Sequence, residues 1–62
     1  MEEEEIKRLI SQYNDELKEI KDNIKEFKKY GVNPHWLYSC REYVNTFISE
    51  LERVLKIMAS ER

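Results

Sequence analysis

The sequence of 62 residues has very few residues that interrupt helices, form disulfides or bind metal ions. It contains one glycine, one proline, one cysteine and one histidine. A single cysteine cannot form a disulfide within the chain, and there is no Cys-x-x-Cys or Glu-x-x-His spacing for a metal. No apolar run approaches the roughly 20 residues that span a bilayer. We therefore expect no disulfide, no metal or cofactor site and no membrane span.

The glycine and the proline stand together, in the segment Gly31-Val32-Asn33-Pro34. Gly31 can adopt the left-handed conformation that ends a helix, because it has no Cβ. Asn33 can cap a following helix with its side-chain oxygen, and Pro34 suits the first helical position. The segment therefore predicts a tight connection between two antiparallel helices.

Apolar residues repeat in steps of three and four on both sides of this connection. Before it they are Ile6, Ile10, Tyr13, Leu17, Ile20, Ile24 and Phe27; after it they are Leu37, Cys40, Val44, Phe47, Leu51, Val54 and Met58. Folding the chain at the connection pairs the two series residue by residue, with Leu17 opposite Phe47. The 3.5-residue period is typical of coiled-coil packing.

These patterns predict an all-α fold, a two-helix antiparallel hairpin of coiled-coil type. We expect a single domain over residues 1–62, with a first helix at about 2–30, a turn at 31–33 and a second helix at about 34–60. A chain this short seldom obtains more than about 3–5 kcal/mol from its own core. Self-association is therefore the expected source of further stability.

The second helix carries apolar residues beyond the predicted seam. Trp36, Tyr43 and Ile57 lie on one flank of that seam, and Ile48 and Leu55 lie on the other. One partner helix cannot cover both flanks, and contiguous exposed apolar patches mark interfaces. We expect these five residues to form the interface of a homodimer, in which two hairpins make a four-helix bundle.

Catalytic chemistry has little support in the sequence. Cys40 occupies a seam position opposite Ile24, which predicts a buried and inert thiol. The serines Ser11, Ser39 and Ser49 have no base at a useful helical spacing, and no glycine-rich phosphate loop is present. We expect a protein that is not an enzyme and has no catalytic residues.

Aromatic residues gather near the predicted turn. Tyr30, His35 and Tyr38 stand beside Trp36 there, and Trp and Tyr are typical interface anchors. Tyr38 falls on the outer face of the second helix, where the hairpin itself does not cover it. Two interpretations remain: this tip contacts a protein partner, or its rings close the end of the bundle.

Positive charge gathers late in the first helix, in Lys18, Lys21, Lys25, Lys28 and Lys29. Such a face can neutralise phosphates, with an affinity that falls steeply in salt. Glu19, Asp22 and Glu26 alternate with these lysines, as in ordinary solvated helices that pair charges three or four residues apart. Nucleic-acid binding is therefore the alternative hypothesis.

In outline the predicted hairpin is similar to Rop, the plasmid copy-number RNA-binding hairpin that dimerises into a four-helix bundle. The likeness is one of architecture and carries no RNA-binding residue over to this chain. The sporulation aspartyl-phosphate phosphatases are also small helical hairpins. Their Ser-Gln-x-Leu-Asp signature is absent here, where the second helix reads Ser39-Cys40-Arg41-Glu42-Tyr43. No family is identified from the residues.

The leading hypothesis is a non-enzymatic interaction or regulatory module that self-associates and presents a helical or tip surface to a protein partner. Met1 is followed by four glutamates instead of the basic and apolar regions of a signal peptide. A lone thiol fits a reducing compartment. We expect a cytoplasmic protein.

Overall fold

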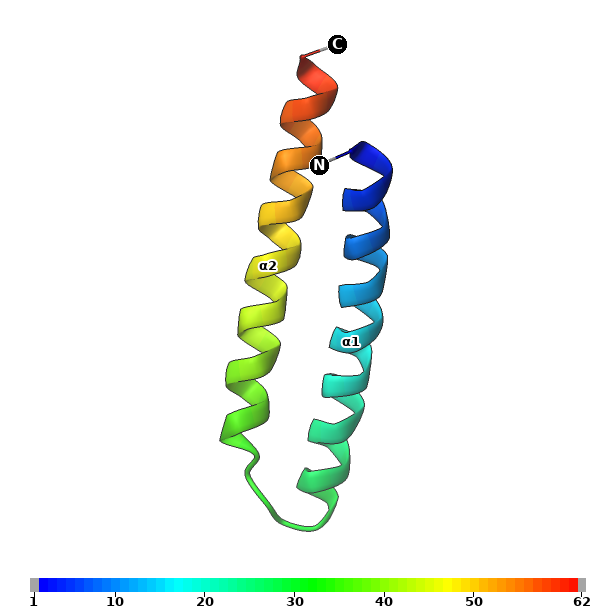
Figure 1. The fold of residues 1–62 in the computed structure, drawn as a ribbon. Coiled ribbons are helices and arrows are strands. Elements are labelled where there is room, and N and C mark those ends of the chain that lie inside the picture. Colours follow the sequence, from blue (N-terminus) through cyan, green and yellow to red (C-terminus); the bar gives the residue numbers. More distant parts are fainter. Residues whose placement is uncertain (1, 62) are drawn as a thin grey trace.

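The computed structural model describes residues 2–61, which form two long helices and the connection between them. Helix α1 spans Glu3–Lys29 and helix α2 spans His35–Ser60. They lie side by side and antiparallel in an elongated hairpin of 51 × 15 × 13 Å (Figure 1). The predicted all-α hairpin is confirmed. Met1 and Arg62, the ends of the predicted domain, lie outside the described residues.

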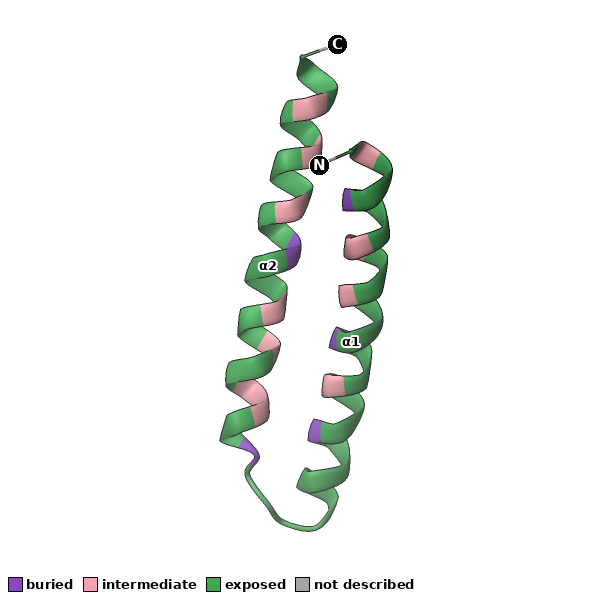
Figure 2. Cartoon of the chain, viewed as in Figure 1, coloured by how far each residue is buried: buried purple, intermediate pink, exposed green. Residues whose placement is uncertain are grey.

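The core is a thin layer between the two helices. Figure 2 shows that the buried and half-buried residues of each helix face the other helix. The buried apolar residues among those described are Ile6, Leu17 and Ile24 in α1 and Ile48 in α2. All three from α1 belong to the predicted seam of the first helix. The fourth does not belong to the predicted seam of the second helix.

Helix α2 is rotated from its predicted orientation. Its buried and half-buried side chains include an inner seam, which we define as Leu37, Arg41, Val44, Ile48, Leu51, Leu55 and Met58. The prediction had Cys40, Phe47 and Val54 in the places taken by Arg41, Ile48 and Leu55. The rotation sets the aliphatic side chains of Ile48 and Leu55 against α1 in place of Phe47 and Val54. Ile48 becomes the most deeply buried residue of α2 in this orientation.

The prediction that Cys40 is buried is therefore wrong, because its thiol is exposed. Phe47 and Val54, also placed in the seam by prediction, are 38% and 43% exposed. The ring of Phe47 packs on Tyr13 at a centroid distance of 4.8 Å. Tyr13 lies one turn before Leu17, the predicted neighbour of Phe47. The two helices are thus shifted by about one turn from the predicted pairing. Figure 1 shows the same shift at the open end, where α2 extends past the beginning of α1.

Helix α1 ends as the sequence predicts. Gly31 has a φ of 76°. The Val32 N–H donates to the Phe27 carbonyl at 3.0 Å, and the Gly31 N–H donates to the Lys28 carbonyl at 3.1 Å. This pair of bonds is the Schellman motif, which satisfies carbonyls at a helix C-terminus.

Helix α2 begins one residue later than predicted, and without the expected cap. Pro34, not Asn33, is the N-cap residue, and no side chain caps the helix. The Pro34 carbonyl accepts the N–H groups of Leu37 at 2.9 Å and Tyr38 at 3.2 Å. The Pro34 side chain is fully buried. Burial of this apolar ring is favourable, and Pro34 lies just outside the first helical turn, so the connection covers residues 30–34.

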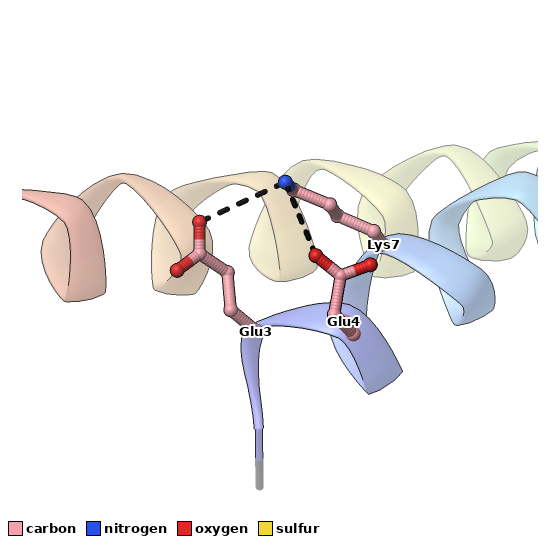
Figure 3. Close-up of polar contacts among 3 residues, drawn as sticks. All are labelled: Glu3, Glu4 and Lys7. Atoms are coloured by element: carbon pink, nitrogen blue, oxygen red, sulfur yellow. Dashed lines mark ion pairs between the residues drawn. The ribbon is translucent and has the colours of Figure 1, made fainter.

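Charge at both ends of α1 follows the helix dipole. Glu3, Glu4 and Glu5 stand in the first turn, and Lys28 and Lys29 stand in the last. The Lys7 Nζ lies 3.8 Å from a carboxylate oxygen of Glu3 and 3.6 Å from one of Glu4 (Figure 3). The Lys7 and Glu4 side chains are more than half exposed, so these pairs contribute little stability.

Candidate interaction surface

Helix α2 carries a second apolar series that α1 leaves partly uncovered. We call it the outer stripe and define it as Trp36, Cys40, Tyr43, Phe47, Val54 and Ile57. The five large side chains are 46% (Trp36), 72% (Tyr43), 38% (Phe47), 43% (Val54) and 50% (Ile57) exposed. Cys40 is exposed as well. Glu50 fills the one position at which this heptad spacing is interrupted.

The outer stripe and the inner seam are the same pattern displaced by one residue. Trp36 precedes Leu37, Phe47 precedes Ile48 and Ile57 precedes Met58. One residue turns an α-helix by roughly 100°. Helix α2 therefore presents two apolar faces about a right angle apart, which is the angle between the two neighbours of a helix in a square four-helix bundle.

Helix α1 adds two rings to the edge of the outer stripe. Tyr13 packs on Phe47, as described above, and Phe27 meets Trp36 edge to face at a centroid distance of 5.4 Å. Phe27 itself remains 38% exposed. The uncovered apolar surface thus continues from α2 onto the flank of α1 that faces the same side of the hairpin.

The five interface residues expected from the sequence divide into two groups. Trp36, Tyr43 and Ile57 belong to the outer stripe and are uncovered in the hairpin. Ile48 is 7% exposed and Leu55 is half-buried, because both lie on the face that packs against α1. The expectation that the hairpin alone leaves both residues partly wet is therefore wrong for Ile48, whereas Leu55 keeps partial exposure.

Sequence reasoning missed Cys40, Phe47 and Val54 as surface residues, since it used them to build the seam. The signal that could have found them is the one-residue displacement itself. Two apolar heptad series run along the second helix, one interrupted by Arg41 and the other by Glu50, and periodicity alone does not say which of them meets the first helix.

The three residues proposed as a tip contact have different surroundings. Tyr30 is 78% exposed. His35 is exposed and sets its ring edge to face with Trp36 at 5.4 Å, so it extends the outer stripe toward the tip. Tyr38 is half-buried, and the prediction that it lies on an uncovered outer face is wrong.

Two cations account for the position of Tyr38. The Lys28 Nζ lies 5.7 Å from the centre of its ring, and the Arg41 Cζ lies 5.2 Å from it. Lys28 comes from α1 and Arg41 from α2, so the ring links the two helices through cation–π contacts. Tyr38 therefore belongs to a separate cation–π cluster and is not part of the outer stripe.

The rest of the described surface has few clusters of side chains that could bind a ligand or react. Two open depressions lie on α1 alone; one is lined by Glu5, Arg8, Leu9 and Gln12, the other by Asp22, Lys25, Glu26 and Lys29. In the second, Lys29 pairs with Glu26 at 3.7 Å. Among residues 2–61, no three His, Cys, Asp or Glu side chains are grouped to hold a metal ion. Neither helix, over the same residues, is long and apolar enough to cross a membrane.

Comparison with known proteins gives no family for this chain. No protein-family model matches it, and neither a curated protein nor a solved structure matches it.

Proposed function

We propose that this protein is a non-enzymatic interaction module that self-associates through the outer stripe of α2. One observation carries the proposal: Trp36, Tyr43 and Ile57 remain about half exposed or more, on the face of α2 next to the one that α1 covers. Contiguous exposed apolar surface of this kind marks sites of association. The dimer is a four-helix bundle of two hairpins.

The surface area of the single hairpin supports this proposal. The chain exposes 5048 Å² for a mass of 7.6 kDa. The scaling for compact monomers gives about 4,300 Å² at that mass. The excess, on the order of 700 Å², is close to the roughly 800 Å² that each partner buries in a standard interface.

The small size of the hairpin core also supports the proposed self-association. Among the described residues, the hairpin fully buries only a handful of apolar side chains. Each large apolar side chain contributes about 1.5–3 kcal/mol when it is fully buried. Covering the outer stripe would therefore add apolar burial comparable to that of the hairpin core itself. The dimer, not the single hairpin, is the proposed stable unit.

Lysine substitutions on the outer stripe test the proposal. Tyr43→Lys and Ile57→Lys place a charge in the proposed interface but disturb no buried residue of the hairpin. We expect the melting temperature of the wild type to rise with protein concentration, and these variants to lose that dependence. Asn45→Lys, on the exposed polar face of α2, is the matched control and keeps it. A wild-type melting temperature that does not change with concentration would refute self-association.

A protein partner and a cytoplasmic location are further parts of the proposal. The exposed Tyr30 and His35 stand at the tip, beyond the centre of the outer stripe, where a partner can reach them in the dimer. The free Cys40 thiol suits a reducing compartment. Retention on RNA or DNA that falls steeply with salt would instead favour the alternative, a nucleic-acid regulator that uses the lysines of α1.

A further inference from the structure

We infer that the partner of the outer stripe is the same stripe of a second copy, running antiparallel, with Phe47 beside the two-fold axis. This inference rests on the proposed self-association and adds its orientation and register. Three features of the hairpin favour the antiparallel arrangement over the parallel one: the position of α1, the single charge in the stripe and the distribution of side-chain size.

The position of α1 separates the two arrangements. Helix α1 lies about 100° around α2 from the outer stripe. A two-fold axis perpendicular to the helices, as in an antiparallel pair, sets both copies of α1 on the same side of the α2 pair. The four helices then enclose one core, which Tyr13 and Phe27 face from α1. A parallel pair sets the two α1 helices on opposite sides and leaves Phe27, which is 38% exposed, outside the contact.

The charge in the stripe gives the second argument. Glu50 is the one charged residue at a stripe position. In a parallel pair it would face the Glu50 of the second copy, and like charges directly opposite each other are unfavourable. Glu50 and Tyr43 stand at nearly equal distances on either side of Phe47. An antiparallel pair therefore brings the Glu50 carboxylate level with a Tyr43 hydroxyl that can donate a hydrogen bond to it.

The sizes of the side chains give the third argument. The large ring of Trp36 stands at one end of the outer stripe, and the smaller Val54 and Ile57 stand at the other. Antiparallel pairing sets Trp36 level with Ile57, and Cys40 level with Val54, in each half of the interface. The large Trp36 ring then faces the smaller Ile57, which suits interdigitating packing at both ends of the interface.

The apolar area of the outer stripe approaches what a specific contact needs. The three aromatic side chains of the stripe are 38–72% exposed, and each offers on the order of 100 Å² for burial. Two copies bring about 600 Å² from aromatic rings alone. Cys40, Val54, Ile57 and the flanking residues raise the total toward the roughly 1,000 Å² that a specific interface needs.

Thiol cross-linking tests the orientation, since Cys40 is the sole cysteine. In the antiparallel pair the two Cys40 residues are 14 positions apart along the contact, about 21 Å. That separation is far beyond the roughly 7 Å at which Cα atoms can be bridged. Val54→Cys adds a thiol level with Cys40 of the second copy. Under mild oxidation we expect this variant to form a covalent dimer, and the wild type to remain uncross-linked.

Each outcome has one meaning. Cross-linking of the wild type through Cys40 would show a parallel pair and overturn the inference, while self-association itself would stand. A dimer by sedimentation that cross-links in neither protein would overturn the register. A monomer by sedimentation would overturn the proposed function, and the orientation with it.

A second variant keeps the test open if Val54→Cys does not fold. It joins Tyr43→Cys and Glu50→Cys in a Cys40→Ser background, where both new thiols replace exposed side chains. In the antiparallel register, the thiol at position 43 of each copy lies level with the thiol at position 50 of the other copy. We expect the double variant to cross-link. As control, Tyr43→Cys alone, in the same background, cross-links only in a parallel pair.

Discussion

Gly31 is the residue at which the hairpin depends most on backbone conformation. Its φ of 76° lies in the left-handed region, and a Cβ built on it would meet no atom within 4 Å. Substitution therefore changes the conformational energy of the backbone without a steric clash. The cost of a left-handed residue that carries a Cβ is about 1–2 kcal/mol.

We predict that Gly31→Ala lowers the free energy of unfolding by about 1 kcal/mol. Gly31→Asn should lower it less, because Asn adopts the left-handed conformation more readily. Urea denaturation of the three proteins at one concentration is the measurement. Equal stability of all three would show that the turn does not hold Gly31 in this conformation.

Cys40 reports on whether the outer stripe is covered. In the single hairpin its thiol is exposed, so a thiol reagent should react with it readily. Dimerisation through the stripe would bury the same thiol. We predict that the labelling rate per molecule falls as protein concentration rises, and that Tyr43→Lys removes this dependence. A slow rate that is the same at every dilution would mean that the hairpin itself buries Cys40.

Helix α1 could be predicted from its sequence more fully than helix α2. It has a single apolar series, and Ile6, Leu17 and Ile24 from that series are buried as the period predicts. The left-handed Gly31 followed from its lack of a Cβ. In each case the residues offered one physical solution.

Helix α2 offered two solutions, and the sequence pattern did not choose between them. Phe47 and Ile48 both continue an apolar series, so the rotation of the helix depends on which series packs better against α1. The cap at Asn33 failed for a related reason, because the burial of Pro34 is a tertiary contact. Properties set by packing between elements lie outside local pattern rules.

The rotation of α2 leads to a prediction at Ile48. Because it is 7% exposed against α1, Ile48→Val should destabilise the protein by about 0.5–1.5 kcal/mol, and Ile48→Ala by about 2–5 kcal/mol. Val54→Ala, at an exposed position, should cost less at concentrations where the protein is monomeric. Chemical denaturation in dilute solution compares them. A larger loss at Val54 than at Ile48 would favour the orientation expected from the sequence.

At the scale of the whole molecule, the hairpin is long, thin and poorly filled. It extends 51 Å but is only 13–15 Å across, so each helix has one neighbour and the core is one side-chain layer thick. Chains of this size rarely obtain more than about 3–5 kcal/mol from such a core. Association supplies a second layer without lengthening the chain, which is the physical basis of the proposed dimer.

Sedimentation equilibrium of the wild-type protein at micromolar concentration tests the central claim most directly. We predict a species of about twice 7.6 kDa that dissociates on dilution. Tyr43→Lys should shift the population toward the mass of a single chain. A fully helical species of 7.6 kDa that persists at all concentrations would contradict the account.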